Sequence, residues 1–209
     1  GGTREPIDSV RFLGNRSSGR MGLALATAAA RRGADVTLIA ANVSLPEPAG
    51  VRRIDVETAA ELAAAARAEF PSSHVLLMAA APADFRASEV AAGKLKRKDG
   101  LDLHLEPTED ILAGLAASRR EGQTVVGFAA EHGDDIGRAR EKLQRKRADL
   151  IVLNDVSDPT IGFESNENAV TLIDRETETS IPRASKDSIA DSILERVDQL
   201  RGRSSLPAH

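Results

Sequence analysis

Hydrophobic residues in this chain fall into short runs separated by longer amphipathic segments. Runs of strand length cover residues 36–41, 75–81, 124–130 and 150–154. The run at 75–81 is apolar throughout, which is typical of a central parallel strand buried on both faces. A shorter run at 51–56 predicts another strand, and strict alternation over 101–105 predicts a strand with one solvated face. The pattern therefore predicts a sheet of mostly buried strands.

The segments between these runs have helical character. They predict helices over 21–32, 58–70, 110–119, 135–147 and 186–201. Gly33 stands where a glycine commonly ends a helix, and Thr108 is expected to cap the helix at 110–119. Residues 82–100 show no period and predict a long loop. Repeated alternation of strand and helix predicts a three-layer α/β fold, with a mostly parallel, Rossmann-like sheet and helices on both faces.

The two ends of the chain differ from this alternation. Residues 169–174 and 179–181, joined by a polar turn, predict a C-terminal β-hairpin extension spanning about 162–182. We expect a single domain over 1–201 and a flexible tail over 202–209. Residues 1–6 have the composition of a turn rather than of an element, as if a preceding strand were missing. We therefore expect a fragment of a longer chain.

Composition narrows the class of protein. The chain has 209 residues, a formal net charge of −4, 2% aromatic residues and neither Trp nor Tyr, which argues against a nucleic-acid surface. The absence of cysteine excludes disulfides, thiolate catalysis and cysteine-ligated zinc. No run has transmembrane length and no signal peptide opens the chain. These features predict a cytoplasmic protein with no membrane partner.

A loop at residues 12–18 runs directly into the alanine-rich helix. Ser17, Ser18, Gly19 and Gly22 surround the predicted start of this helix. Uncovered backbone N–H groups and the positive end of the helix dipole favour an anion there, and a phosphate fits. The alternative is that Ser17 or Ser18 simply caps the helix. Local sequence leaves both interpretations open.

Positive charge is concentrated near the same predicted edge. Ligands of parallel sheets bind at the carboxyl ends of the strands, here 79–81, 128–131 and 154–155. Arg138, Lys142 and Lys146 are spaced four apart and share one helix face, and lysines such as Lys94 occur in the long loop. A solvated basic face is the alternative. Together these residues indicate a ligand with several negative charges, such as a triphosphate.

Single residues and missing motifs refine this hypothesis. Asp84 follows a strand end and could hold a divalent cation or a ribose hydroxyl, or could cap a turn. Phe128 could flank a base or belong to the core. The chain has no G-x-x-x-x-G-K-[ST] loop, which excludes a P-loop NTPase, and no G-x-G-x-x-G. The strand at 36–41 is followed by Asn42 instead of an acid, which argues against a standard NAD site. Without tyrosine, a tyrosine-based dehydrogenase is impossible.

A series of motifs resembles bacterial phosphopantothenoylcysteine synthetase. The matching segments are Gly2 to Asp8, Asn15 to Gly22, Ala79 to Phe85 leading to Lys94-Leu95-Lys96, Gly127 to Glu131, Asn154-Asp155-Val156 and Gly162-Phe163. They occur in order from residue 1 to about residue 170. The series is far more specific than any one of its members.

The resemblance implies a ligase of coenzyme A biosynthesis. Such an enzyme joins L-cysteine to 4′-phosphopantothenate with CTP as co-substrate and with Mg²⁺. An acyl-cytidylate and pyrophosphate form first, and the cysteine amine then displaces CMP. The family implies a homodimer whose active sites use residues of both subunits, with the loop and hairpin after Gly162 as contact elements. It also implies fusion to an upstream flavin-dependent decarboxylase domain.

Residue roles carry over by motif. Asn15 is implied to hold the acyl-cytidylate for attack by the amine. Lys94 is implied to neutralise charge at the α-phosphate, although Lys96 could take this role because the loop before Leu101 is short. Asp84 is implied to serve the ribose or the cation. The implied nucleotide-binding positions are Ser17, Gly19, Gly22, Met78, Ala79, Ala80, Asp84, Glu109, Asp110, Ile111, Leu112, Phe128, Lys142, Lys146 and Asn154.

Two other functions stay open on the sequence. A non-catalytic nucleotide-binding or dimerisation module would bind CTP without turnover. A nicotinamide- or flavin-dependent oxidoreductase is disfavoured by the missing fingerprint, and would be recognised by stabilisation with NADPH but not with CTP.

Overall fold

The computed structural model describes residues 1–97, 101–131, 135–155 and 165–204. Its central sheet has the strand order β11-β10-β9-β8-β5. These strands are β5 (Val75–Met78), β8 (Thr124–Glu131), β9 (Leu150–Asp155), β10 (Glu167–Ile173) and β11 (Glu178–Ser185). β5, β8 and β9 are parallel, whereas β10 and β11 are antiparallel to their neighbours. The α/β class and the C-terminal hairpin are confirmed, and the sheet is mixed.

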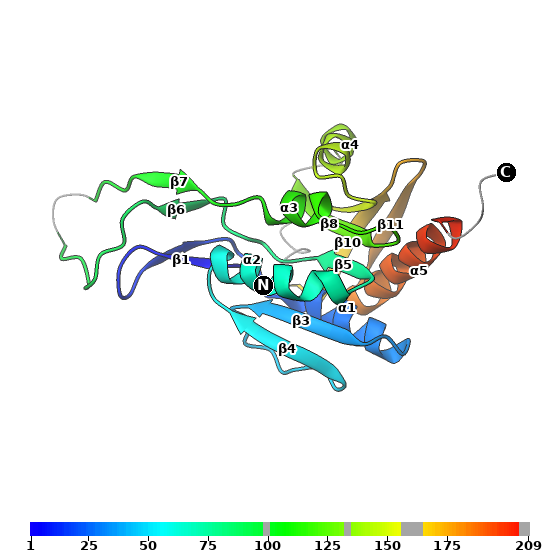
Figure 1. The fold of residues 1–209 in the computed structure, drawn as a ribbon, viewed down its shortest axis with the longest axis horizontal. Helices are drawn as coiled ribbons and strands as arrows, with labels where there is room; N and C mark the ends of the chain where they lie inside the picture. Colours follow the sequence, from blue (N-terminus) through cyan, green and yellow to red (C-terminus); the bar gives the residue numbers. More distant parts are fainter. Residues whose placement is uncertain (98–100, 132–134, 156–164, 205–209) are drawn as a thin grey trace.

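Helices cover both faces of this sheet (Figure 1). On one face lie α1 (Arg20–Arg31) and α5 (Lys186–Ser204), and on the other lie α2 (Ala59–Glu69), α3 (Ile111–Ala117) and α4 (Ile136–Arg145). Alternate residues of the buried strands point to opposite faces. Val126, Leu150 and Val152 pack towards α1 and α5, whereas Val125, Ile151 and Leu153 pack towards α2, α3 and α4. The sheet therefore separates two apolar cores.

A second, parallel pair of strands lies beside this body. β3 (Val36–Ala41) pairs with β4 (Val51–Val56), at the bounds predicted from the sequence. The following helix α2 begins with a capping box, in which Thr58 accepts from the backbone N–H of Glu61 and the Glu61 side chain accepts from the backbone N–H of Thr58. A 3₁₀ turn, η1 (Phe70–Ser72), ends this segment.

Two short antiparallel hairpins project from the body as an arm (Figure 1). β1 (Arg4–Pro6) pairs with β2 (Phe12–Gly14), and β6 (Phe85–Ala87) pairs with β7 (Leu105–Pro107). The prediction of turn and loop for residues 1–6, 12–18 and 82–100 was thus wrong at these strands. Each strand has three residues, too few to produce a recognisable alternation.

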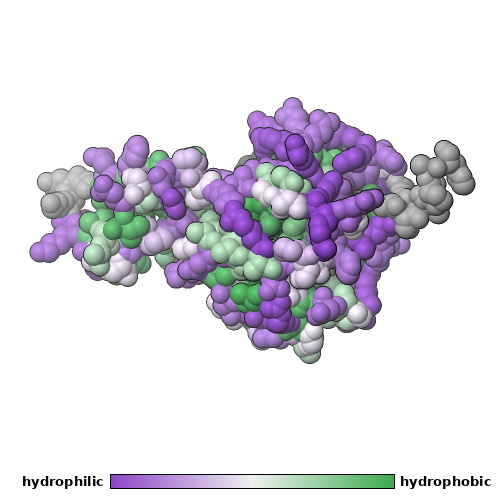
Figure 2. All heavy atoms as spheres, viewed as in Figure 1, coloured by the Kyte–Doolittle hydropathy of each residue, from purple (hydrophilic) through white to green (hydrophobic). Residues whose placement is uncertain are grey.

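The predicted strand at 101–105 was also wrong, because only Leu105 belongs to a strand. Leu101, Leu103 and Leu105 are exposed on the arm instead of facing a core. Green, hydrophobic spheres interrupt the purple surface of the arm in Figure 2. The alternating leucines of residues 101–105 therefore form an exposed apolar surface and not the buried face of a strand.

Three further features differ from prediction. β5 ends at Met78 rather than at residue 81. Among the described strands it pairs with β8 alone, so it lies at one edge of the sheet and not at the predicted central position. Thr108 does not cap α3, because its hydroxyl donates to the carbonyl of Ala83 (2.5 Å), while the Asp110 side chain accepts from Ala113 N (3.1 Å). Helix α5 extends to Ser204, and the rest of the predicted tail lies outside the described residues.

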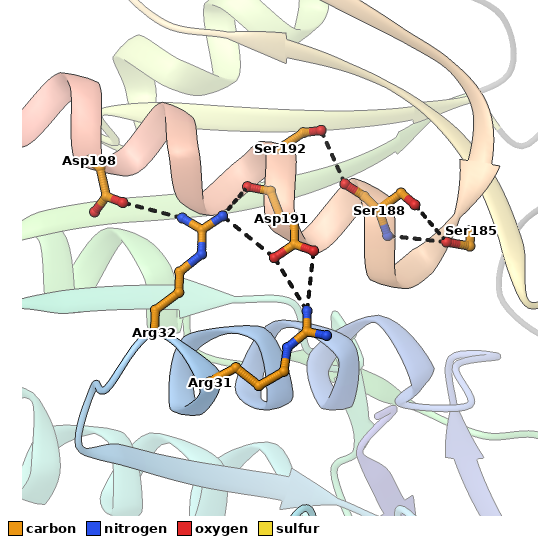
Figure 3. Close-up of polar contacts among 7 residues, drawn as sticks. All are labelled: Arg31, Arg32, Ser185, Ser188, Asp191, Ser192 and Asp198. Carbon is orange, nitrogen blue, oxygen red and sulfur yellow. Dashed lines mark hydrogen bonds and ion pairs between the residues drawn. The ribbon is translucent and has the colours of Figure 1, made fainter.

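Helices α1 and α5 run side by side in the same direction. At the end of α1, Arg31 and Arg32 form ion pairs with Asp191, and Arg32 also pairs with Asp198 further along α5 (Figure 3). At the start of α1, Arg20 contacts the residues that precede α5: its Nη1 donates to Asn166 Oδ1 (3.1 Å). The N-termini of both helices therefore lie together. None of the helices in the described ranges is long and apolar enough to cross a bilayer.

Candidate functional site

A pocket of about 540 Å³ lies where the carboxyl ends of β5, β8 and β9 meet the start of α1. Its lining includes every site position predicted from the sequence except Lys94. One wall comes from α3 and α4, and the opposite wall comes from α1, β10 and α5. The pocket thus joins the two faces of the sheet across its edge.

The loop before α1 presents uncovered backbone to this pocket. The N-cap residue is Gly19, with φ 77° and no side-chain capping bond, and Arg20 N lies 3.5 Å from Ser18 Oγ. A Cβ on Gly19 would lie 2.6 Å from Val43 Cγ2, so this position requires glycine on two counts. A Cβ on Gly22 would meet nothing within 4 Å, which leaves open space beside the first turn. The geometry favours the anion interpretation over the serine cap.

The loop that follows β5 forms the rim opposite this cradle. Asn15 Nδ2 donates to the carbonyl of Pro82 (2.9 Å), which ties the cradle to the rim. Ala83 N donates to Thr3 Oγ1 (2.9 Å), and the Ala83 carbonyl accepts from Thr108. These bonds hold the rim from both sides and fix the next residue, Asp84, at the pocket lining.

Acidic groups at the pocket do not form a dense metal site. Within the described ranges, no three His, Cys, Asp or Glu side chains are grouped to hold a metal ion. Of the carboxylates that line the pocket, Glu109 pairs with Arg67 and Asp110 pairs with Lys146, whereas Asp84 forms no ion pair with the described residues. A lone carboxylate suits a Mg²⁺ ion that receives its other ligands from phosphates and water.

The α3/α4 wall satisfies its charges internally. Lys142 Nζ donates to the carbonyl of Phe128 (2.9 Å), and the Lys146 ammonium pairs with the Asp110 carboxylate. Partial burial acts to raise the pKa of Asp110, but the Lys146 hydrogen bond, the Ala113 N–H and the nearby positive charges outweigh it and lower this pKa below its ordinary value. Asp110 is therefore ionised and fixes the position of Lys146.

The α1/α5 wall is different. Lys186 is only 6% exposed, and burial together with the positive charge of Arg20 lowers its pKa to about 8. The buried atoms Arg20 Nε and Asn154 Oδ1 have no hydrogen-bond partner among the described residues. Arg20, Asn168 and Lys186 also line the pocket, and sequence reasoning missed all three. A signal was present, since a lysine in the first turn of a helix opposes the helix dipole.

The two lysines of the arm lie outside this pocket. Lys94 and Lys96 are exposed, and the backbone between them is clamped at Leu95. Leu95 N donates to Asp8 Oδ2 (3.0 Å), and Arg11 Nη2 donates to the Leu95 carbonyl (2.7 Å). Desolvation opposes ionisation of Asp8, but hydrogen bonds from backbone N–H groups and from Arg11 hold its pKa well below the ordinary value. The arm therefore holds these lysines away from the pocket of the chain that carries them.

Comparisons with known proteins agree with the fold and the motif series. The family model described as DNA/pantothenate metabolism flavoprotein C-terminal domain matches residues 1–200. The chain is 44% identical over 201 residues to the coenzyme A biosynthesis bifunctional protein CoaBC of Escherichia coli strain K12, covering 94% of this chain and 50% of that protein. It is 45% identical over 212 residues to the CoaBC protein of Mycobacterium tuberculosis strain H37Rv, again covering 94% and 50%.

A crystal structure gives the same relation. The C-terminal domain of a coenzyme A biosynthesis bifunctional protein CoaBC superposes with a TM-score of 0.82 at 32% identity, covering 97% of this chain and 93% of that one. The chain spans about half the length of the curated relatives that it matches. From the fold, the pocket and these matches together, the chain belongs to the family of DNA/pantothenate metabolism flavoprotein C-terminal domains.

Proposed function

We propose that this domain is a phosphopantothenate–cysteine ligase that uses CTP and forms an acyl-cytidylate. The observation that carries the proposal is the convergence of the motif residues: positions from residue 15 to residue 154 line one pocket, although the motifs are far apart in the sequence. The relatives at 44–45% identity are bifunctional proteins of coenzyme A biosynthesis, which supports the same substrate class.

In the first step, the carboxylate of 4′-phosphopantothenate attacks the α-phosphorus of CTP, the bond between the α-phosphorus and the bridging oxygen breaks, and pyrophosphate leaves. The backbone N–H groups at the start of α1, beside Ser17 and Gly19, bind phosphate oxygens. Fixed donors at this position stabilise the negative charge as it develops. Asp84 would be the protein ligand of Mg²⁺, which would supply shielding of the triphosphate charge.

In the second step, the amine of L-cysteine attacks the acyl carbon and CMP leaves. Asn15 lies between cradle and rim, and its Nδ2 is already used by the Pro82 carbonyl. Its Oδ1 is then the atom available to accept from the attacking amine, which orients the nucleophile towards the acyl-cytidylate. The α3/α4 wall, with Asp110, Lys142 and Lys146, is the proposed site of the cytidine.

Lys94 acts in this scheme only if a second subunit supplies it. It lies outside the pocket of its own chain, on the arm that projects from the body. The large hydrophobic side chains that are exposed in the described part of the chain, Val10, Phe12, Phe85, Val90, Leu101, Leu103 and Leu105, lie on the arm or in its loops. Exposed apolar groups of this kind mark a protein contact. We therefore propose a homodimer in which the arm carries Lys94 or Lys96 to the partner's pocket.

Further proposals concern the contacts, the domain fusion and the location of the whole protein. The contact role of the 162–182 extension stays a prediction, and Val156, Gly162 and Phe163 of the motif series lie outside the described residues. The curated relatives are bifunctional, so fusion to an upstream flavin-dependent decarboxylase domain is proposed for this protein. Its cytoplasmic location is proposed on the same basis.

The decisive experiment measures pyrophosphate release by the purified protein with CTP, Mg²⁺, 4′-phosphopantothenate and L-cysteine. The proposal predicts release that requires CTP and 4′-phosphopantothenate, and one molecule of phosphopantothenoylcysteine for each pyrophosphate. ATP in place of CTP serves as the nucleotide control, and omission of cysteine should leave a single burst of pyrophosphate. A folded dimer that binds CTP without any turnover would instead identify the non-catalytic module.

The oxidoreductase alternative has its own readout. Stabilisation of the protein by NADPH but not by CTP, measured as the thermal shift of unfolding, would favour that alternative. The structure offers no positive support for it, because the loop before α1 lacks the G-x-G-x-x-G fingerprint.

A further inference from the structure

The α1/α5 wall of the pocket concentrates positive charge at the starts of two helices. Helices α1 and α5 are parallel neighbours, so the positive ends of their dipoles lie side by side at the pocket. Each of these ends begins with a basic residue, Arg20 in α1 and Lys186 in α5. Cations are unfavourable at helix N-termini, and here two of them approach each other. Such an arrangement favours a strongly anionic ligand.

Asn166 holds the two basic residues in register. Its side-chain Oδ1 accepts from Arg20 Nη1 (3.1 Å), and its backbone carbonyl accepts from Lys186 N (2.9 Å). The start of α5 is capped by Ser185, whose Oγ accepts from Ser188 N (3.1 Å), as Figure 3 shows. The local geometry is thus built by the fold before any ligand arrives, which is the condition for efficient electrostatic stabilisation.

Two polar atoms of this wall are buried and lack partners. Asn154 is 8% exposed and lines the pocket, and its side-chain Oδ1 has no hydrogen-bond partner among the described residues. The same holds for Arg20 Nε. Buried polar atoms are rarely left without partners in a folded protein, because each costs about 1–3 kcal/mol. Arg20 Nε is a donor, so an acceptor oxygen of an anion would complete its hydrogen bonding. Asn154 Oδ1 is an acceptor and needs a donor, such as a hydroxyl or an ammonium group, which an ionised diphosphate does not supply.

We infer that Arg20 and Lys186, at the converging N-termini of α1 and α5, bind the diphosphate part of the nucleotide that leaves as pyrophosphate. This inference rests on the proposed function for the identity of the nucleotide. Two cations and two helix N-termini match the charge of a diphosphate better than that of a single phosphate monoester. The wall adjoins the cradle at Ser17 and Gly19, so a triphosphate can extend from the cradle to Lys186.

Lys186 then acts as a catalytic residue of the first step. When the carboxylate of the acid attacks the α-phosphorus, the electron pair of the broken bond stays on the bridging oxygen of pyrophosphate. The ammonium of Lys186 and the guanidinium of Arg20 lie where this charge accumulates and stabilise it without transferring a proton. The α3/α4 wall holds the rest of the nucleotide during the same step.

The test is a calorimetric titration of inorganic pyrophosphate with Mg²⁺ into the full chain. We expect Lys186→Gln to weaken pyrophosphate binding by about tenfold or more, because one charge-assisted interaction is lost. Arg183→Gln is the matched control: Arg183 lies on β11 close to α5 in the sequence, is exposed and pairs with Glu167 outside the pocket. This control should bind pyrophosphate as the wild type does.

Folding and specificity are checked in the same samples. The unfolding temperature of each variant without ligand reports any change in folding, and the rise above that temperature caused by pyrophosphate should be lost in Lys186→Gln and kept in Arg183→Gln. Equal pyrophosphate affinity in the wild type and Lys186→Gln would overturn the inference. A Lys186→Gln variant that lost affinity only for 4′-phosphopantothenate would overturn the inference as well. Because pyrophosphate binding requires no turnover, a protein that binds it through Lys186 but shows no ligase activity would contradict the proposed function and leave the subsite standing.

Discussion

The two walls of the pocket treat charge in opposite ways. On the α3/α4 wall each lysine has a protein acceptor: Lys142 the carbonyl of Phe128, and Lys146 the carboxylate of Asp110. On the α1/α5 wall, Arg20 and Lys186 stand at helix N-termini, and Arg20 Nε is buried without a hydrogen-bond partner among the described residues. The first wall is complete without a ligand, which suits recognition of a neutral base and ribose. The second brings together two cations and two positive helix ends, which suits an anion.

The difference teaches how one pocket can separate binding from chemistry. A wall whose charges are already paired changes little when the reaction starts, and so contributes mainly to affinity. A wall with excess positive charge interacts more strongly as the leaving group becomes more negative, and so contributes to the rate. Variants in the pocket, in the core beside α5 and on the arm test this division and the fold that supports it.

The largest effect is expected where the two walls meet, at Asn15. Asn15→Asp puts a negative charge next to the proposed acyl-cytidylate and replaces the donor that bonds Pro82. We expect overall turnover to fall by roughly a thousandfold, since loss of a single preorganised group has effects of this size. A first-turnover burst of pyrophosphate should persist, and quench-flow measurement of both products distinguishes the two steps. An unchanged overall rate would remove Asn15 from the mechanism.

A buried ion pair between α5 and the residue that follows β10 provides the next test. Arg196 of α5 forms a buried ion pair with Asp174, whose side chain is 2% exposed and also accepts from the backbone N–H groups of Glu176 and Thr177 (2.8 and 2.9 Å). Asp174→Ala leaves Arg196 buried without its partner, and should lower the free energy of unfolding by about 3 kcal/mol. Denaturant titration measures it. The exposed pair of Arg31 with Asp191 is the control, for which Arg31→Gln should cost less than about 1 kcal/mol.

The pH dependence of stability follows from the same carboxylate. Burial acts to raise the pKa of Asp174, but the two backbone N–H groups and Arg196 outweigh it and lower this pKa below the ordinary 3.8. A lowered folded pKa means that the stabilisation is present above pH 3.8 and is lost as the pH falls through the folded value. Asp174→Ala should therefore unfold with a weaker dependence on pH below this point than the wild type. Identical acid unfolding curves would contradict the pairing.

The arm is expected to have a smaller effect on turnover than Asn15. Lys94→Gln should slow pyrophosphate release by about a hundredfold if Lys94 serves the partner's pocket. Mixing this variant with Asn15→Asp and allowing subunits to exchange should restore about a quarter of the wild-type activity, since half of the dimers are mixed and one of their two sites is intact. No recovery after verified exchange would place Lys94 in its own subunit's site or outside the mechanism. Lys96→Gln, tested in parallel, decides between the two lysines.

Sequence patterns predicted the body of the fold well and the arm poorly. The runs at 36–41 and 51–56 matched β3 and β4, and Thr58 and Glu61 form a capping box at the start of the helix predicted there. The arm was missed because its strands have three residues each and are stabilised by contacts far apart in the sequence, such as that of Asp8 with Leu95. The periodicity of hydrophobic residues reflects local structure, so it does not predict such contacts.

The candidate site shows the same division. The motif series gave the pocket residues from Asn15 to Asn154, because each motif ends a strand or opens a helix at one edge of the sheet. It assigned no role to Arg20, although this residue lies within the motif Asn15 to Gly22, and it did not include Asn168 or Lys186. Lys186 follows the C-terminal hairpin, and its place in the pocket depends on β10 and β11 folding back so that α5 begins beside α1. This placement of α5 depends on contacts between segments that are distant in the sequence, so no local pattern predicts it.

The most direct test of the central claim compares two ligands on two variants by calorimetry. Pyrophosphate and CMP, each with Mg²⁺, are titrated into Lys186→Gln and Lys146→Gln. If the walls divide the nucleotide as proposed, Lys186→Gln weakens pyrophosphate by about tenfold and leaves CMP nearly unchanged, whereas Lys146→Gln does the reverse. Equal weakening of both ligands by both substitutions would show that the pocket acts only through its summed positive charge, and would contradict the account.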